Sequence, residues 1–250
     1  MTIELRATCG TRTPELCRLR SPLGATDGRL RLWRPYAFWP LSDPASLSLR
    51  RVTEVSIHKF PVLSTSRLTL RAIAPRDVAE FRTLMMVPEV TRYSNWPEAP
   101  SDDQANDWIR NLSELFPSGK GCAWVIEERS SASFVGAVHF NYFYWEWRVG
   151  GIGYEAHPNY WGRGLTTEAL RAVVAYGHRF LALNRIEAWT LPGNGASDRV
   201  LEKAGFQFEG VFRQKGYFKG AFHDFRMFGR VASDAVMHAP VRRDRPVAAE

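Results

Sequence analysis

The chain has 250 residues, 45% of them hydrophobic and 24% charged, which is typical of a globular domain with additional segments. It has no apolar run long enough to span a membrane, and its three cysteines, Cys9, Cys17 and Cys122, fit neither a disulfide framework nor a metal motif. We therefore expect no membrane association and no metal, and a reduced cytoplasmic protein rather than a secreted disulfide scaffold.

The formal net charge of +7 is unevenly distributed along the sequence. Residues 1–60 contain ten basic and five acidic residues, whereas residues 61–230 contain 20 and 18. A nucleic-acid-binding face needs a basic stripe within the folded domain, and the sequence of that region shows none. We therefore expect no nucleic acid partner.

Residues 1–60 keep no helical or alternating period, and proline, glycine and arginine interrupt them. We interpret them as a flexible N-terminal extension, followed by a folded domain over residues 61–232 and a tail over residues 233–250. Four aromatic residues stand close together in the extension, where they could dock on the domain or on a partner: Trp33, Tyr36, Phe38 and Trp39.

Regular patterns begin after Ser66. Residues 67–73 alternate between apolar and polar types and predict a strand. Pro75 and Asp77 favour the first turn of a helix, because proline suits that position and aspartate suits the positive helix end. The buried face predicted for this helix consists of Val78, Phe81, Leu84 and Met85.

A second helix should follow Ser101, which forms a capping box with Gln104. The buried face of this helix is predicted to be Trp108, Ile109, Leu112 and Leu115. The elements expected next are a hairpin of residues 123–127 and 134–140, a strand over 149–156, a helix over 166–181, a strand over 186–191, a helix over 196–204 and a hairpin within 216–228.

The helix over 166–181 should bury Leu170, Val173, Val174, Phe180 and Leu181 on one stripe. The next helix should end at Gly205 in a left-handed cap, with Phe206 packing back against it. The order of these elements predicts a mixed α/β domain.

A turn containing Gly162 and Gly164 connects a predicted strand to the clearest predicted helix. Such a turn lets backbone N–H groups converge on an anion, the helix N-terminus adds partial positive charge, and Arg163 can add a cation. A tight turn without a ligand is the alternative. No lysine precedes Thr166 at the Walker position and no third glycine completes a dinucleotide fingerprint, which disfavours ATP and NAD.

In this segment the sequence resembles the GCN5-related N-acetyltransferase (GNAT) superfamily, in the style of its ribosomal-protein N-terminal (Rim-type) branch. Residues 159–164 look like the Q/R-x-x-G-x-G/A motif for the pyrophosphate of acetyl-CoA, with Asn159 in place of the first residue. Further downstream, Asn194 and Ser197 match the N-x-x-S that contacts the CoA arm. The resemblance covers about residues 64–232, with its blocks in the right order.

The resemblance implies the GNAT fold, in which helices flank a mixed, mostly antiparallel central sheet. It also implies acetyl-CoA as co-substrate, with backbone amides around Tyr154 to Ala156 holding the acetyl carbonyl. The residues that it implies for cofactor binding are Tyr154, Ala156, Trp161, Gly162, Arg163, Gly164, Leu165, Thr166, Asn194 and Ser197.

The implied reaction is attack of a neutral amine on the acetyl thioester, which requires proton transfer. Glu155 is the candidate base, unless it is a solvent-facing or salt-bridged strand carboxylate. Tyr217 is the candidate acid for the CoA thiolate, unless it is a packed hairpin aromatic. Ser197 is the alternative acid, unless its hydroxyl serves the start of a helix.

Two other groups of residues are interpreted as structural. The histidines have no spacing that indicates a metal site or a triad, and Glu168 and Asp224 are expected to make fold contacts. The aromatic residues before the strand over 149–156 could wall an acceptor site, although packing is the favoured interpretation. These residues are His139, His157, His178 and His223, and Phe143, Tyr144, Trp145 and Trp147.

The acceptor is expected to be a primary amine. An α-amino group is roughly 10% neutral at pH 7, whereas a lysine side chain is neutral to only about 0.04%. A protein N-terminus can therefore be deprotonated by a weaker base than a lysine side chain needs. Two alternatives stay open, a small-molecule acetyltransferase for an antibiotic, polyamine or amino acid, and a non-catalytic acyl-CoA-binding module. Whether the protein forms a homo-oligomer is also left open.

Overall fold

The computed structural model describes residues 59–234. The residues that carry the predicted extension and tail, 1–58 and 235–250, lie outside this range. Phe60 is packed against Phe116 and Trp124, with ring centroids 5.0 and 5.6 Å apart. The Trp124 indole N–H also donates to the Pro61 carbonyl, 2.7 Å away, which ties the beginning of the described chain to the sheet.

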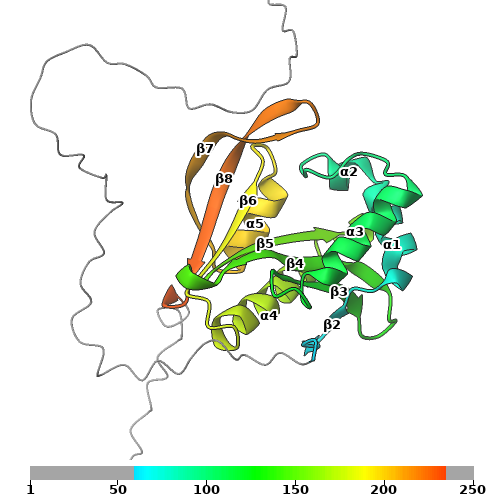
Figure 1. Cartoon of the computed structure of the whole chain (residues 1–250), viewed down its shortest axis with the longest axis horizontal. Helices are drawn as coiled ribbons and strands as arrows, with labels where there is room; N and C mark the ends of the chain where they lie inside the picture. Colours follow the sequence, from blue (N-terminus) through cyan, green and yellow to red (C-terminus); the bar gives the residue numbers. More distant parts are fainter. Residues whose placement is uncertain (1–58, 235–250) are drawn as a thin grey trace, which may run out of the picture. The chain divides into compact units, whose positions relative to one another are not determined.

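The described strands form one sheet in the order β1-β2-β3-β4-β5-β6-β8-β7, in which β5 and β6 run parallel and the other neighbours are antiparallel (Figure 1). The expected mixed, mostly antiparallel sheet is therefore present. The strands are β1 (Leu63–Ser64), β2 (Leu68–Ala72), β3 (Cys122–Glu128), β4 (Phe134–Tyr144), β5 (Val149–Ala156), β6 (Arg185–Thr190), β7 (Gln207–Phe218) and β8 (Ala221–Val231).

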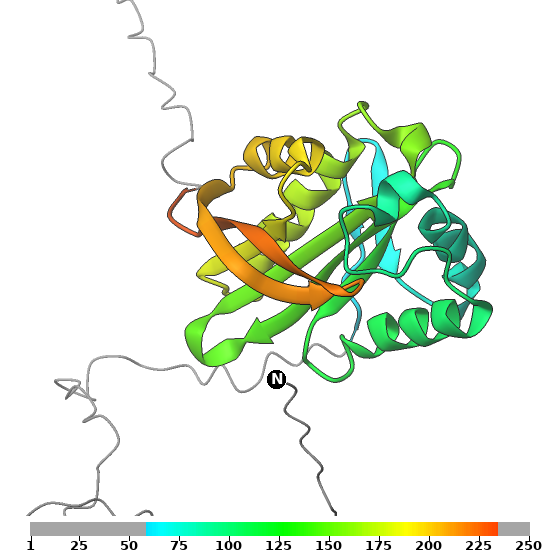
Figure 2. The same cartoon turned by 90° about the horizontal axis from the view of Figure 1, so that it is seen from above.

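Helices cover both faces of the central strands (Figure 2). One face carries the first helices of the domain, and the other carries the two that follow β5 and β6. The helices are α1 (Val78–Met85), α2 (Pro88–Thr91), α3 (Asp102–Glu114), α4 (Leu165–Arg179) and α5 (Gly195–Lys203). None of the helices described in residues 59–234 is long and apolar enough to cross a membrane.

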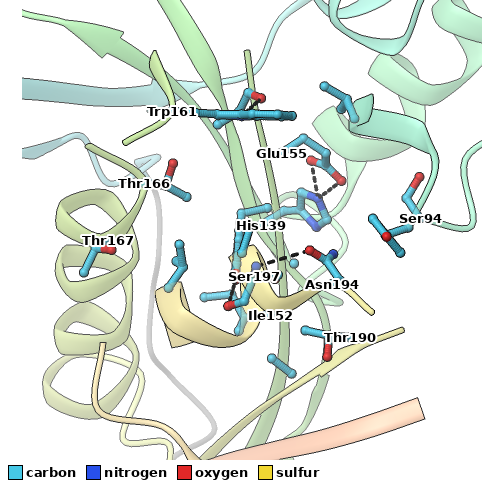
Figure 3. Close-up of a pocket in the computed structure, with 18 of the residues that line it drawn as sticks. Ser94, His139, Ile152, Glu155, Trp161, Thr166, Thr167, Thr190, Asn194 and Ser197 are labelled. Atoms are coloured by element: carbon cyan, nitrogen blue, oxygen red, sulfur yellow. Dashed lines mark hydrogen bonds and ion pairs between the residues drawn. The ribbon is translucent and has the colours of Figure 1, made fainter. Parts of the chain in front are cut away.

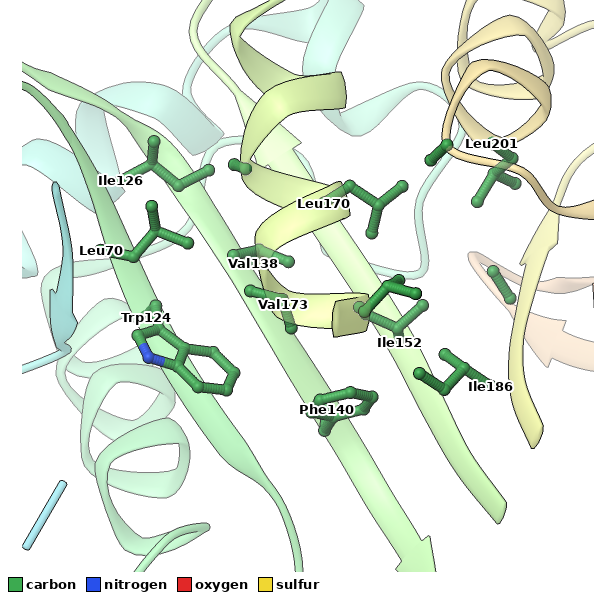
Figure 4. Packing of buried hydrophobic residues seen from close by; sticks show 14 of the residues in the cluster. Leu70, Trp124, Ile126, Val138, Phe140, Ile152, Leu170, Val173, Ile186 and Leu201 are labelled. Carbon is green, nitrogen blue, oxygen red and sulfur yellow. The ribbon is translucent and has the colours of Figure 1, made fainter. Parts of the chain in front are cut away.

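Buried side chains along β3 and β4 point alternately to the two faces of the sheet, and they contribute to a hydrophobic core on each face. Trp124 and Val138 point toward α4, where they pack with Leu170 and Val173 (Figure 4). Their neighbours in sequence, such as Val125, belong to the core beneath α1 and α3. Successive strand side chains point to opposite faces, so one strand pair serves both layers.

The sheet opens between its two parallel strands. β5 pairs with β6 only from Val149 to Gly151, whereas its pairing with β4 continues to Ala156. On the other side, β6 stays paired with β8 as far as Thr190. The edge of β5 beyond Gly151 therefore has no partner on the β6 side within the described residues, and a gap separates the two halves of the sheet.

Most predicted elements are confirmed. Ser101 and Gln104 form the expected capping box at the start of α3, and Gly205 adopts the expected left-handed conformation with a φ of 88°. Two expectations were wrong in part. Phe180 is 64% exposed, because α4 ends just before it, and the final hairpin begins at Gln207, where β7 already pairs with β8.

Candidate active site

A cavity of about 1660 Å³ occupies the gap between β5 and β6. Its walls come from the β5 edge, the N-terminal turns of α4 and α5, the end of β6 and the loop between α2 and α3 (Figure 3). Segments from both halves of the chain therefore contribute to one site. The opening exists because the parallel pairing stops at Gly151.

The predicted glycine turn forms one end of this cavity. Gly162 and Gly164 have φ values of 73° and 76°, a region that disfavours residues with a Cβ atom. Gly164 is the N-cap of α4, and no side chain caps the helix there. The amide groups of the first turn, at Leu165 and Thr166, are therefore available to an anion at the positive end of the helix.

An ion pair between Glu168 and Arg67, together with the hydrogen bonds around it, connects this glycine turn to the segment before β2. The Glu168 carboxylate accepts hydrogen bonds from the hydroxyls of Thr65 and Ser66 and from the backbone and guanidinium N–H groups of Arg67. Arg67 also donates to the Arg163 carbonyl at 2.9 Å. Burial of Glu168 raises its pKa, but these hydrogen bonds outweigh burial and lower the pKa to about 2. The expected fold contact of Glu168 is thus present.

The start of α5 forms the opposite wall. Asn194 is its N-cap, and its side-chain oxygen accepts a hydrogen bond from the Ser197 backbone N–H at 3.2 Å. The Ser197 hydroxyl lies 2.7 Å from the Tyr154 hydroxyl, across the gap on β5. Burial raises the pKa of Tyr154, so this phenol keeps its proton. Ser197 therefore offers its hydroxyl to the cavity rather than to the helix end.

The Glu155 carboxylate lies in the cavity wall with a side-chain exposure of 9%. The indole N–H of Trp96 donates to its Oε1 atom at 2.8 Å, and Nε2 of His139 lies 3.2 Å from its Oε2 atom. The carboxylate is thus fixed by an aromatic residue from the α2–α3 loop and by a histidine from β4. It is neither solvent-facing nor paired with a lysine or arginine in the described part of the chain.

His139 is buried, and the expectation that it is an ordinary structural or surface histidine missed its contact with Glu155. Its Nδ1 atom is 2.8 Å from the side-chain oxygen of Asn141, which lies at a register shift in β4. Burial lowers the pKa of His139, but the charge of Glu155 and the two hydrogen bonds raise it by more, so that it lies above the usual value.

The sequence gives no signal for this pair. His139 and Glu155 lie sixteen positions apart, and they meet only because Ala137 pairs with Glu155 in the antiparallel register of β4 and β5. Trp96 was likewise missed, since it belongs to an irregular loop.

Most of the residues predicted for the site come together around the cavity. Three do not line it. Leu165 is buried in the core, Arg163 pairs with Glu128 at 2.5 Å, and Tyr217 is 66% exposed on the β7–β8 hairpin. The predicted residues that do line the cavity are Tyr154, Glu155, Ala156, Trp161, Gly162, Gly164, Thr166, Asn194 and Ser197.

The sequence also missed a cationic part of the wall. Arg171 of α4 and Arg199 and Lys203 of α5 line the cavity together. Arg171 is held in place by the Lys203 carbonyl, to which its guanidinium donates. These three positive charges come from two helices, so no local run of basic residues could reveal them.

The aromatic residues at the end of β4 and immediately after it lie elsewhere. Tyr144, Trp145 and Trp147 are 53%, 41% and 73% exposed, and none of them lines the cavity. Tyr144 contacts Tyr142 and Trp147, and Trp145 contacts Phe143. Phe143 packs against the core, as the favoured interpretation expects, whereas the exposure of the other three does not fit core packing. The aromatic residues that line the cavity are Tyr93, Trp96, Tyr142, Tyr154, Tyr160, Trp161 and Trp189.

The chain has relatives with a named activity. Residues 67–207 match the family model described as an acetyltransferase (GNAT) domain. The chain is 37% identical over 172 residues to the uncharacterized N-acetyltransferase YoaA of Bacillus subtilis, covering 69% of this chain and 97% of the relative. It is 26% identical over 170 residues to the ribosomal protein uS5-alanine N-acetyltransferase of Escherichia coli, covering 65% and 86% of the two chains.

The fold has a close counterpart among solved structures. The structure of Mycobacterium smegmatis RimJ in complex with CoA-disulfide aligns with a TM-score of 0.61 at 23% identity. The alignment covers 67% of this chain and 83% of that chain. This likeness confirms the fold that was expected from the sequence.

Proposed function

Because the chain belongs to the GNAT acetyltransferase family, we propose that it moves the acetyl group of acetyl-CoA to a protein N-terminal amine, by direct attack in a ternary complex. The chain is an N-acetyltransferase, as its relatives are named, and the proposal concerns the identity of the acceptor amine. One observation carries the proposal, namely a sequestered carboxylate, Glu155, beside the unpaired edge of β5.

Acetyl-CoA would bind with its pyrophosphate on the first turn of α4. The left-handed residues Gly162 and Gly164 and the uncapped helix N-terminus support this position. Cations on α4 and α5, including Arg199, add attraction for the remaining phosphate. The CoA-disulfide named for Mycobacterium smegmatis RimJ agrees with this choice of cofactor.

The acetyl carbonyl would lie at the β5 edge between Tyr154 and Ala156. Backbone N–H groups without a strand partner can donate to the oxygen that becomes negative during attack. Such donors are fixed in advance by the pairing of β5 with β4, so they need little reorganisation when charge develops.

Glu155 is the proposed base, directly or through a water molecule. At pH 7 deprotonation costs about 1.4 kcal/mol for an α-amino group and about 4.6 kcal/mol for a lysine. A carboxylate is a modest base, which suits the less basic amine. The activity named for the Escherichia coli relative, acetylation of an alanine of ribosomal protein uS5, also favours an N-terminal acceptor.

For protonation of the departing thiolate we propose Ser197 over Tyr217. The Ser197 hydroxyl lines the cavity and is bonded to Tyr154, whereas Tyr217 is mostly exposed and does not line it. A CoA thiolate can also leave without a proton, so this role contributes less than that of Glu155.

We propose that the catalytic domain spans residues 61–232. The Pro61 carbonyl and Phe60 both contact Trp124, so the core begins at this point. At the other end, the Val231 backbone N–H donates to Asp234. A truncated chain of residues 59–234 is expected to retain turnover, and loss of turnover together with intact folding would contradict this boundary.

The deciding experiment follows thiol release from acetyl-CoA with the full-length protein. Peptides with a free N-terminus are compared with the same peptides acetylated at the N-terminus and with a panel of small amines. Glu155→Gln is the test variant, and Glu80→Gln, an exposed carboxylate of α1, is the matched control. We expect release with free N-termini, unchanged in the control and strongly reduced in Glu155→Gln.

The other outcomes identify the alternatives. Release with small amines alone would assign the protein to the small-molecule acetyltransferases. Binding of acetyl-CoA without release on any acceptor would favour a non-catalytic acyl-CoA-binding module.

A further inference from the structure

A buried imidazole lies directly behind the carboxylate that serves as the proposed base. Nδ1 of His139 is 2.8 Å from the amide oxygen of Asn141, and Nε2 is 3.2 Å from Oε2 of Glu155. In the tautomer in which Nδ1 donates to this amide oxygen, Nε2 is the atom where the ring gains or loses a proton. We propose that His139 accepts, through Glu155, the proton that the acceptor amine loses.

This inference rests on the proposed function, and its steps conserve charge and protons. The ammonium nitrogen gives one proton to a Glu155 oxygen, and Glu155 passes a proton to the Nε2 lone pair of neutral His139. The amine then attacks the acetyl carbon, and the C–S bond breaks with its electron pair on the CoA sulfur. The imidazolium left on His139 faces a regenerated carboxylate, and it returns the proton to solvent through Glu155 when the product leaves.

Relative proton affinities favour this route over Glu155 alone. Moving a proton from an α-amino group to an ordinary glutamate is unfavourable by about four pKa units, whereas moving it to an ordinary histidine is unfavourable by about 1.5 units. The Glu155 charge raises the pKa of His139 above that ordinary value despite burial. The pKa of His139 therefore lies closer to that of the α-amino group. The pair therefore holds the proton better than an isolated carboxylate.

The neighbouring residues hold the His139 ring and the Glu155 carboxylate against each other (Figure 3). His139 is 4% exposed, and a Cβ atom at Gly153 would lie 2.8 Å from its ring, so only glycine leaves room for the imidazole. Glu155 is the only charged side chain within hydrogen-bond distance of the ring in the described range, and Asn141 is neutral. Trp96 holds the carboxylate from the other side.

His139→Gln distinguishes two roles of His139, accepting the proton and holding the Glu155 carboxylate in position. Glutamine can donate an N–H to Glu155 and keep it oriented, but it cannot take up a proton. We expect about a 10²-fold loss of kcat/KM for a peptide N-terminus at pH 7, with an unchanged KM for acetyl-CoA. The loss should shrink with a weakly basic amine that is already neutral. His178→Gln, on α4 outside the cavity lining, is the matched control.

The pH profile gives a second readout. Because His139 must be neutral to accept a proton, wild-type kcat/KM should rise with pH through its elevated pKa. That rise should disappear in His139→Gln. An equally active His139→Gln variant with an unchanged pH profile would overturn the proposal.

Nitrogen NMR of the imidazole tests the pair without any turnover. The His139 signal is identified by its absence from the spectrum of His139→Gln. We expect the pKa of His139 to lie above 6.5 in the wild type and to fall in Glu155→Gln, where only the Asn141 hydrogen bond still opposes the effect of burial. A pKa at or below 6.5 in the wild type, or one indifferent to Glu155→Gln, would refute the inference. Failure of every acceptor in the release assay would instead refute the proposed function.

Discussion

At the scale of single residues, the position of Glu155 determines what the cavity can do. The carboxylate is held by Trp96 and His139 at the edge of β5, where it is shielded from bulk water. Its neighbours leave room for an amine or a water molecule, because each carboxylate oxygen can accept more than one hydrogen bond.

Glu155→Gln preserves the size of this side chain and removes the base. We expect kcat to fall by about 10²-fold or more, while the KM for acetyl-CoA changes little, because the contacts proposed for acetyl-CoA on β5 are backbone groups that the substitution keeps. Steady-state kinetics with a peptide acceptor measures both parameters. An unchanged kcat in Glu155→Gln would exclude Glu155 as the base.

Gly164 affects the site through its backbone. Its φ of 76° costs a residue with a Cβ atom roughly 1 kcal/mol, and the nearest atom to an added Cβ, on Arg67, is 3.7 Å away. Gly164→Ala should therefore be destabilised by strain rather than by a clash, and it should also bind acetyl-CoA more weakly.

Gly119, with a φ of 67° and no atom near an added Cβ, is the matched control for Gly164→Ala. It follows α3 and does not line the cavity. Denaturant unfolding and calorimetric titration are the measurements, and both variants should lose similar stability. Equal loss of acetyl-CoA affinity in Gly119→Ala would contradict a specific role of Gly164.

At the scale of elements, the start of α4 is fixed by a segment far away in sequence. Glu168 in its first turn is bonded to Thr65, Ser66 and Arg67, which immediately precede β2. This contact places the glycine turn against the edge of the sheet. The position of the proposed anion site therefore depends on the segment before β2 as well as on the glycine turn.

Glu168→Gln tests this contact through pH. The folded-state pKa of about 2 lies below the ordinary glutamate value of 4.5, so the ionised carboxylate stabilises the fold above pH 4.5, and the contribution is lost as the pH falls toward 2. We expect the wild type to exceed Glu168→Gln by about 1–2 kcal/mol at pH 7, with the difference shrinking in acid. Urea unfolding from pH 7 to pH 3 measures it. A pH-independent difference would show that the charge is not responsible.

At the scale of the whole domain, the final hairpin reaches across to the other half of the fold. The Lys219 ammonium, at the β7–β8 turn, donates to the Thr91 carbonyl at 2.7 Å and lies 3.5 Å from Glu98. Thr91 ends α2, and the loop that follows carries Trp96. The hairpin therefore steadies the loop that holds Glu155.

Lys219→Met should loosen this loop without touching the cofactor end of the cavity. The hydrogen bond from the Lys219 ammonium to the Thr91 carbonyl stabilises the loop by about 1 kcal/mol. Its loss should raise the KM for the acceptor roughly fivefold and leave the KM for acetyl-CoA unchanged. Lys215→Met, on the exposed surface of β7, is the control. A rise confined to the KM for acetyl-CoA would disprove the expected role.

The sequence by itself determined most of the elements and the glycine turn before α4. Hydrophobic periodicity depends on local spacing, and the left-handed backbone at Gly162, Gly164 and Gly205 depends on the absence of a Cβ atom, so both can be read along the chain. Glu155 could be nominated because it precedes the turn on a predicted strand. The length of the final hairpin and the exposure of Phe180 were misjudged, because pairing and packing with distant segments set them.

Only the tertiary structure decided which side chains share the cavity. His139 contacts Glu155 because of the strand register, and Trp96 contacts Glu155 because of the path of a loop. Arg171 and Arg199 line the same cavity because their helices pack side by side. Arg163 and Tyr217 fit the sequence pattern, yet the fold turns one toward Glu128 and leaves the other exposed. A motif fixes the backbone around it, whereas the neighbours of a side chain depend on contacts between segments far apart in the chain.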